Sequence, residues 1–479
     1  MKIKLNFTLA SLAVLLGFVP ITYSQSTSED IDDYLNYCHQ NNMFNGSVLV
    51  ALDNEILYQQ GFGYCDSEQT SEIKPTTSFY LCSVSKQFTA MGIMLLKKNG
   101  NLTYNDKISK FFPNLPDFAN DITIKHLLTH TSGIPDYFNS IYKPGLTNQN
   151  VFEFIMNLDS LNFTPEDKFS YSNSGYVLLS LIIEEVSKMT YAEFLDENIF
   201  SPLAMTSTLA YEVSTPKIEN RAIGYTPSGD LSDYDILTTG DGGLFSTVED
   251  LYKWDRALYT EKLVAQEMIE EAFSAIKLSN GSVSNYGYGW GVQRDSTTNR
   301  VEHSGSLAGF RTIISRDLDS KFVCILLTNH GNQLDLFQTV EDLRTIANGT
   351  KWEYPKVSIL TKLIDVMNAQ GIDSTIRFYK EFKDDHDPKY SFEENQLNSF
   401  GYWLGNEGMP TEAQIIFQLN IEQFPAAFNV YDSYAESCFY LEQYELSKEN
   451  YMKSLEINPE NGNAINMIGR IKKKIANNE

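Results

Sequence analysis

The chain has 479 residues and a formal net charge of −25, and 42% of its residues are hydrophobic and 13% aromatic. That length suits two or three domains, and that hydrophobic content excludes a disordered chain. The negative charge argues against nucleic acid or an anionic membrane surface as the main partner. We interpret the acidity as keeping the protein soluble.

The N-terminus has the pattern of a secretory signal. Lys2 and Lys4 precede an apolar stretch from about Leu9 to Val19, and Ser24 follows as a plausible cleavage position. The apolar stretch is too short and wrongly flanked to span a membrane. We therefore expect residues 1–24 to be a signal peptide and the mature protein to be exported, periplasmic or secreted, with no membrane span after cleavage.

From Phe44 onward the chain alternates between strand-like and helix-like patterns. Two β-rich runs surround the turn dipeptide Asp53-Asn54, helices and loops fill the region from about Asp121 to Leu278, and β-rich runs such as "KFVCILLTNHG" return afterwards. Strands at both ends with helices between them predict an α+β domain over residues 25–350. Its terminal strands should share one antiparallel sheet flanked by helices.

Past Trp352 the sequence becomes helical and repeats itself. Pro425 and Pro459 lie 34 residues apart. Small and aromatic residues stand at matching offsets before them, as in the pairs Gly401 and Ala435, Ala413 and Ser447, and Phe417 and Tyr451. This period resembles the tetratricopeptide repeat, in which small residues let paired helices approach. Residues 351–479 are therefore expected to form an all-α repeat domain, which offers a surface for a possible protein partner.

The stretch "SFYLCSVSKQFTAMGIMLL" places Ser83 three residues before Lys86. A serine hydroxyl needs a nearby base to become a nucleophile, and Lys86 one helical turn on would lie within its reach. The same spacing also occurs at Ser71/Lys74, Ser140/Lys143, Ser214/Lys217 and Ser274/Lys277. Only Ser83 has a strand-like lead-in and a long apolar helix behind it. The alternative is that Ser83 is simply a helix N-cap.

Two further motifs carry candidate functional residues. In "FSYSNSGY", Tyr171 could carry the serine proton and Asn173 could orient the substrate and the lysine, although a loop tyrosine can also simply pack its ring. In "EHSGSLAGF", His303 and Gly305 precede a strand where glycine permits close backbone approach, although a histidine at a strand end is often structural.

No metal site or other cofactor is predicted. The five cysteines are scattered without metal-ligand spacing, and an odd, sparse count is not a disulfide framework. His126 and His130 stand four residues apart, but no acidic third ligand follows them at helical spacing.

Taken together, the motifs resemble the serine β-lactamase/penicillin-binding family, in the branch of class C β-lactamases, D-alanyl-D-alanine carboxypeptidases and related esterases. The resemblance covers roughly Ile31 to Gly349. It rests on Ser83-x-x-Lys86, Tyr171-x-Asn173 and His303-x-Gly305 in this order, and on the stretches "LLTHTSGIPDY", "GGLFSTVEDLYKW", "YGYGWGV" and "HSGSLAGFRT". This resemblance implies a β-lactamase-like fold, in which an antiparallel sheet is flanked by helices and accompanied by a helical domain.

The resemblance also implies a mechanism. Ser83 would attack a carbonyl to give an acyl-enzyme, Lys86 and Tyr171 would share the proton transfers, and Asn173 would contact the substrate. The backbone N–H groups of Ser83 and Ser306 would receive the oxyanion, and water would then release the acyl group.

One departure from the family pattern bears on the substrate. Class C β-lactamases usually carry Lys-Thr-Gly where this chain has His303-Ser304-Gly305, and a histidine is mostly neutral at pH 7. That difference favours a peptidase, amidase or esterase over an efficient β-lactamase. An alternative from another class is a catalytically quiet protein that senses a ligand in the pocket and engages a partner through its repeats.

Overall fold

The computed structural model describes residues 23–478, except for 212–214, 216–217, 227–228, 332–333 and 386. The chain forms two compact units that divide between Glu353 and Tyr354. The predicted signal peptide covers residues 1–24, and residues 1–22 lie outside the described part of the chain. Its last two residues are the first two of helix α1 (Tyr23–Gln40). Within the described residues no helix combines the length and the apolar character needed to cross a bilayer.

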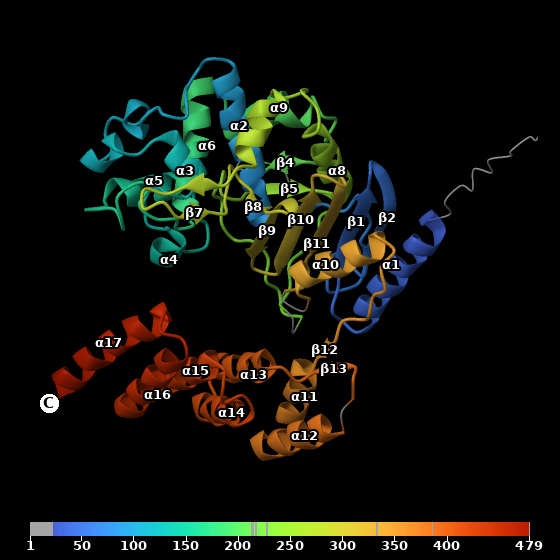
Figure 1. Ribbon diagram of the computed structural model, residues 1–479, viewed down its shortest axis with the longest axis vertical. Helices are drawn as coiled ribbons and strands as arrows, with labels where there is room; N and C mark the ends of the chain where they lie inside the picture. The colour runs from blue at the N-terminus through green and yellow to red at the C-terminus, as the bar shows by residue number, and fades with distance from the viewer. Residues whose placement is uncertain are drawn as a thin grey trace, which may run out of the picture. The chain divides into compact units, whose positions relative to one another are not determined.

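The first unit is built on one six-stranded antiparallel sheet (Figure 1). In spatial order its strands are β2 (Glu55–Phe62), β1 (Gly46–Leu52), β11 (Phe322–Thr328), β10 (Phe310–Asp317), β9 (Asn299–Leu307) and β8 (Gly291–Arg294). Strand β1 pairs with β11, so strands from the two ends of this unit share a sheet, as predicted.

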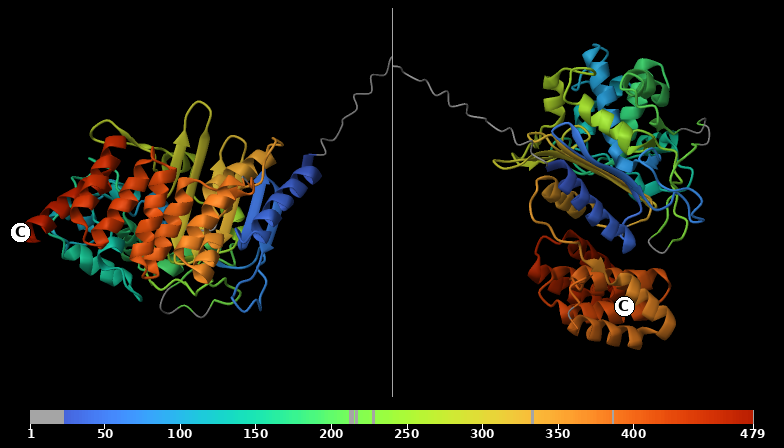
Figure 2. Two further views of the ribbon diagram at one scale, coloured as in Figure 1. Left: turned by 90° about the horizontal axis from the view of Figure 1, so that it is seen from below. Right: turned by 90° about the vertical axis from the view of Figure 1, so that its right-hand side faces the viewer.

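Helices cover both faces of this sheet, which explains the composition of its central strands. Figure 2 shows α1 and α10 (Leu336–Ala347) on one face and the remaining helices of the unit on the other. The sequence of β11, "FVCILLT", is buried along its whole length, and β1 is buried except at its last residue. Strands covered on both sides read as continuous apolar runs rather than as alternating patterns.

The helices on the far face make up the helical part of the first unit. They are α2 (Lys86–Lys98), α3 (Ile124–Leu128), α4 (Phe138–Ile141), α5 (Asn148–Met156), α6 (Asn173–Ser187), α7 (Tyr191–Leu195), α8 (Val248–Ala257) and α9 (Gln266–Ala272). Helix α2 lies at their centre, and its residues from Lys86 to Leu96 are all buried. Short strands β3 (Phe79–Tyr80), β5 (Leu244–Ser246) and β4 (Leu209–Ala210) form one small sheet, and β6 (Ile276–Lys277) and β7 (Val283–Ser284) form another.

The second unit consists of helical hairpins that recur at a constant interval. Its elements are β12 (Val357–Ser358), α11 (Leu360–Gln370), α12 (Ile372–Asp384), β13 (Tyr390–Ser391), α13 (Glu394–Asn406), α14 (Pro410–Gln423), α15 (Phe428–Tyr440), α16 (Tyr444–Ile457) and α17 (Gly462–Asn478). Helices α13, α15 and α17 begin 34 residues apart. A Cβ at Gly401 would lie 2.5 Å from the Phe417 ring, so the small residue does let paired helices approach. That these hairpins are tetratricopeptide repeats stays a prediction.

Candidate active site

Ser83 lies in a one-turn 3₁₀ helix, η1 (Cys82–Ser85), between β3 and α2. We expected Ser83 to start the α-helix itself, but the α-helix begins three residues later, at Lys86. The residue at the N-cap position of α2 is Ser85, so the structure gives no N-cap role to Ser83. Cys82 just before it has a φ of +51°, a left-handed conformation that residues other than glycine rarely adopt.

Lys86 is fully buried, and its amine contacts the candidate nucleophile Ser83 and two residues far away in the chain, Asn173 and Asp241. Its Nζ atom donates to Ser83 Oγ at 3.1 Å, to Asn173 Oδ1 at 2.8 Å and to the backbone oxygen of Asp241 at 2.7 Å. These partners fix the amine beside the serine hydroxyl. Proton transfer between the two groups therefore needs no large rearrangement of the side chains.

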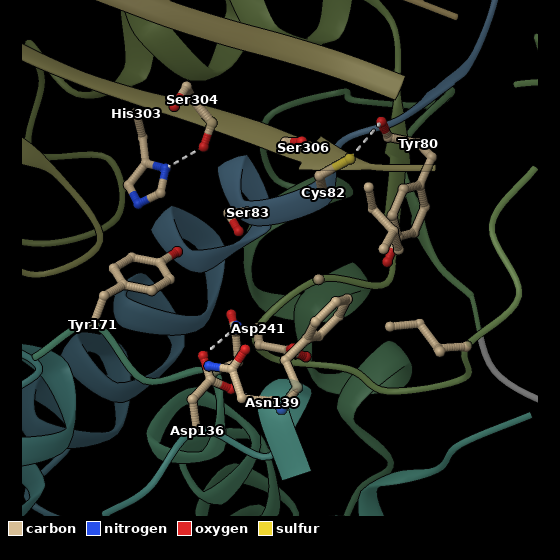
Figure 3. A pocket seen from close by; sticks show the side chains of 15 residues that line it. Tyr80, Cys82, Ser83, Asp136, Asn139, Tyr171, Asp241, His303, Ser304 and Ser306 are labelled. Carbon is tan, nitrogen blue, oxygen red and sulfur yellow. Dashed lines mark hydrogen bonds between the residues drawn. The ribbon is translucent and has the colours of Figure 1, made fainter. Parts of the chain in front are cut away.

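Tyr171 lies in the loop before α6, and Asn173 is the first residue of that helix. The Nδ2 atom of Asn173 donates to Asp136 Oδ2 at 3.0 Å, which orients the amide so that its oxygen faces Lys86. The Tyr171 ring centroid lies 4.9 Å from Lys86 Nζ, and Figure 3 shows its hydroxyl directed toward Ser83. That hydroxyl is buried and has no hydrogen-bond partner among the described residues, so it remains able to exchange a proton in the pocket.

His130 holds the Tyr171 ring in place. The two rings lie 4.1 Å apart between centroids, and His130 Nδ1 accepts a hydrogen bond from the Ser172 N–H at 3.1 Å. Burial lowers the pKa of His130 well below its usual value, so this imidazole is neutral. Sequence reasoning considered His130 only as a metal ligand beside His126, but α3 ends before it.

Strand β9 forms the opposite wall of the site, and Gly305 lets it approach η1. A Cβ at Gly305 would lie 2.5 Å from the Leu81 carbonyl oxygen and 2.8 Å from Cys82 Cβ. No larger side chain fits there without moving the backbone next to Ser83. The glycine predicted to permit close approach therefore stands where β9 packs against the nucleophile turn.

The register of β9 leaves the Ser306 N–H facing the pocket side of the strand. Leu307 and Phe310 flank a two-residue turn, so they form a hydrogen-bonded pair of β9 and β10. The next pair, Ser306 and Arg311, is then non-hydrogen-bonded, and its backbone groups point away from the partner strand. The Ser306 N–H can therefore receive an oxyanion, as the motif implies.

His303 is a neutral part of the pocket wall. Its Nδ1 lies 2.7 Å from the Ser304 carbonyl oxygen, which can only accept, so Nδ1 carries the proton. Its Nε2 then accepts from the Tyr286 hydroxyl at 2.8 Å. Burial, with the nearby Lys86, lowers the pKa of His303 to about 3. His303 therefore offers no positive charge to a substrate carboxylate at neutral pH.

This buried histidine predicts how stability depends on pH. Unfolded His303 takes up a proton near pH 6.5, whereas folded His303 takes one up only near pH 3. Between these values the unfolded state binds more protons. The His303 contribution to the free energy of unfolding should therefore be complete above pH 6.5 and fall by about 1.4 kcal/mol per pH unit below it. Urea unfolding gives the free energy of unfolding at each pH between 7 and 4.5. This free energy should fall less steeply with decreasing pH in His303→Gln than in the wild type. An equal pH dependence in the two proteins would contradict the prediction.

The structure adds two acidic residues that sequence reasoning missed, Asp136 and Asp241. Both line the cavity in front of Ser83, which has a volume of about 390 Å³. The other lining residues are Tyr80, Cys82, Phe138, Asn139, Tyr171, Asn173, Ile236, Gly242, His303, Ser304, Ser306 and Leu307. Asp136 is the next-to-last residue of the quoted stretch "LLTHTSGIPDY", and Asp241 directly precedes "GGLFSTVEDLYKW". These stretches supported the family resemblance, but they gave no sign that the two carboxylates face the pocket. Among the described residues no group of three or more His, Cys, Asp or Glu is placed to hold a metal ion.

Comparisons with known proteins agree with the resemblance drawn from the motifs. The family model described as Beta-lactamase matches residues 31–348. Penicillin-binding protein 4* of Bacillus subtilis is 35% identical over 325 residues, which are 63% of this chain and 71% of that protein. The octameric penicillin-binding protein homologue from Pyrococcus abyssi has 27% identity and a TM-score of 0.61, covering 71% of this chain and 81% of its own. D-amino acid amidase from Ochrobactrum anthropi has 25% identity and a TM-score of 0.57, covering 68% and 97%.

Proposed function

The chain belongs to the Beta-lactamase family of serine hydrolases, and from this premise we propose that it is an exported enzyme that forms an acyl-enzyme on Ser83. Its substrates are amides, peptides or esters in preference to β-lactams. The observation that carries the proposal is the placement of Lys86 Nζ, which contacts both Ser83 Oγ and Asn173 Oδ1. Export rests on the signal pattern of residues 1–24.

In the proposed reaction Ser83 Oγ attacks the substrate carbonyl carbon. The serine proton passes to the Lys86 and Tyr171 pair, and the N–H groups of Ser83 and Ser306 stabilise the oxyanion. The same pair then protonates the departing amine or alcohol as its bond to the acyl carbon breaks. In deacylation a water oxygen attacks the acyl carbon while the Lys86 and Tyr171 pair takes the water proton. The pair then gives that proton to Ser83 Oγ as the bond between Oγ and the acyl carbon breaks, which releases the acid.

The preference against β-lactams rests on the charge of the pocket. The lysine that class C enzymes usually carry at the position of His303 is absent, and His303 is neutral with both ring nitrogens already bonded. A substrate carboxylate would find no fixed positive charge at this position of the strand. The similarity to D-amino acid amidase is consistent with amide hydrolysis.

A fluorophosphonate probe tests the proposal directly. The wild type should be labelled covalently, Ser83→Ala should lose all labelling, and Ser71→Ala should keep it because Ser71 is an exposed serine of another Ser-x-x-Lys match. Gel fluorescence and the mass of the labelled peptide are the measurements. If the folded wild type took up no label, the proposal would be wrong and a catalytically quiet ligand-binding protein would be favoured instead.

A further inference from the structure

His130 contacts the chain around Tyr171 at three points. The Ser170 N–H donates to the His130 carbonyl oxygen at 2.9 Å, and the Ser172 N–H donates to His130 Nδ1 at 3.1 Å. These two bonds hold the residues on either side of Tyr171. The third contact is between the rings of His130 and Tyr171, whose centroids lie 4.1 Å apart with 33° between their planes.

Few other contacts restrain Tyr171. Residues 168–172 belong to no helix or strand, so no regular ladder of backbone hydrogen bonds holds them. The Tyr171 hydroxyl has no hydrogen-bond partner among the described residues. Two further rings beside Tyr171 are more distant, with centroids 6.1 Å away at Tyr286 and 6.3 Å away at His303. A side chain without close restraints samples several rotamers, so the orientation of the phenol depends most on His130.

His130 is itself held firmly. It is 1% exposed, and its φ of +56° is a left-handed conformation that packing has to maintain. Its N–H donates to the carbonyl oxygen of Leu127, in the last turn of α3, at 3.3 Å. Its ring also contacts the rings of Tyr176 on α6 and of Tyr286, with centroids 5.0 Å and 4.7 Å away. His130 is therefore a fixed support for the loop that carries Tyr171.

The surroundings of His130 argue against a direct part in the chemistry. His130 is not among the residues that line the cavity, so a substrate bound there would not touch it. Its Nδ1 accepts from the Ser172 N–H, so the proton of this neutral ring is on Nε2. In the described part of the chain Nε2 is buried without a hydrogen-bond partner, so it has no group to which it could pass a proton. His130 can still determine where the Tyr171 oxygen lies.

That location matters because proton transfer needs its two heavy atoms within about 2.6–3.2 Å, and a misplacement of about 1 Å can cost about 10²-fold in rate. We propose that His130 is a positioning residue for the reaction at Ser83, and that it acts only by holding the Tyr171 hydroxyl toward Ser83 and Lys86. This inference rests on the proposed function, because it requires that Tyr171 exchange the serine proton.

The first test replaces His130 with alanine, which removes the ring and the Nδ1 acceptor together. The kcat/KM for the neutral ester p-nitrophenyl butyrate should fall about 10²-fold, because Tyr171 then has no fixed orientation. His130→Asn tolerates the left-handed backbone and keeps an acceptor for the Ser172 N–H. It should recover about 5-fold of that loss, the usual effect of one hydrogen bond. Equal rates for the wild type and His130→Ala, or no recovery in His130→Asn, would overturn the inference.

A double-mutant cycle with Tyr171→Phe distinguishes positioning from a general loss of structure. Tyr171→Phe keeps the ring but lacks the hydroxyl that His130 holds. In that background His130→Ala should lower kcat/KM by less than about 5-fold, because the effects of residues that act as a unit do not add. A larger further loss would show that His130 acts by a route other than the Tyr171 hydroxyl, and the inference would be wrong.

His126→Asn is the matched control, because His126 is a second buried histidine of the same stretch. Its Nδ1 accepts from the Thr123 N–H at 3.2 Å and its Nε2 lies 3.2 Å from Glu166 Oε1. The variant leaves the three contacts around Tyr171 in place, so it should keep the wild-type kcat/KM within about 2-fold. A loss as large as that in His130→Ala would overturn the inference.

Circular dichroism shows whether each variant is folded. If His130→Ala does not fold, His130→Asn takes its place in the cycle. Its expected loss is about 20-fold with Tyr171 present and less than about 5-fold in the Tyr171→Phe background. An equal loss in the two backgrounds would overturn the inference.

Fluorophosphonate labelling separates this inference from the proposed function. Ester turnover and labelling of Ser83 that are equally fast in the wild type and in His130→Ala would overturn the positioning role alone. Absence of both ester turnover and labelling in the wild type would overturn the proposed function, and the positioning role with it.

Discussion

Replacing Lys86 with methionine should lower kcat/KM for p-nitrophenyl butyrate by about 10³-fold. Methionine fills a similar buried volume but removes the amine that contacts Ser83 Oγ and Asn173 Oδ1. Removing a positioned proton-transfer group typically costs 10²- to 10⁴-fold in rate, so about 10³ is the middle of that range. Stopped-flow measurement of the acylation burst distinguishes slow acylation from slow release of the acyl group.

The matched control for that variant is Lys74→Met. Lys74 is an exposed lysine of another Ser-x-x-Lys match and lies outside the cavity lining. The Lys74→Met variant should keep the wild-type kcat/KM within about 2-fold, because substitutions of exposed residues away from a site rarely change stability or activity. A folded Lys86→Met protein that retained more than about a tenth of the wild-type rate would show that another group takes the serine proton.

Replacing Asp255 with alanine should reduce the free energy of unfolding by about 3–5 kcal/mol, the usual effect of breaking a buried ion pair. Asp255 on α8 and Arg316 on β10 are both fully buried, and Arg316 Nε donates to Asp255 Oδ1 at 2.5 Å. The variant would remove the carboxylate that pairs with this guanidinium, which lies among the rings of Tyr259, Phe273 and Trp290. Chemical denaturation followed by circular dichroism measures the loss.

Two further variants control for the Asp255 result. Glu185→Ala breaks the exposed Glu185–Lys188 pair and should change stability by less than about 1 kcal/mol. The double variant Asp255→Leu with Arg316→Met should be more stable than Asp255→Ala alone, because it removes the unpaired charge along with its partner. An Asp255→Ala protein as stable as the wild type would mean that this ion pair does not stabilise the packing of α8 against the sheet.

Local patterns in the sequence were sufficient to predict much of this architecture. The pairing of β1 with β11 followed from apolar runs at both ends of the first unit, and the 34-residue interval of the helical hairpins followed from spaced small and aromatic residues. The order of the Ser-x-x-Lys, Tyr-x-Asn and His-x-Gly motifs predicted that they belong to one site, and the structure places these residues around one cavity. Such features depend on near neighbours in the chain, which a sequence displays directly.

Other features depend on which distant segments meet. The spacing of Ser83 and Lys86 could not distinguish a 3₁₀ turn from the start of an α-helix, because β9 packing at Gly305 shapes that turn. The charge of His303 depends on burial and on Tyr286, and the acidity of the cavity depends on Asp241, which lies 155 residues from Lys86 in the chain.

The physical reason is that desolvation and Coulomb interactions act through space. A motif can therefore identify the groups that react, while the charge that selects their substrate is set by side chains that only the folded chain brings to the same cavity.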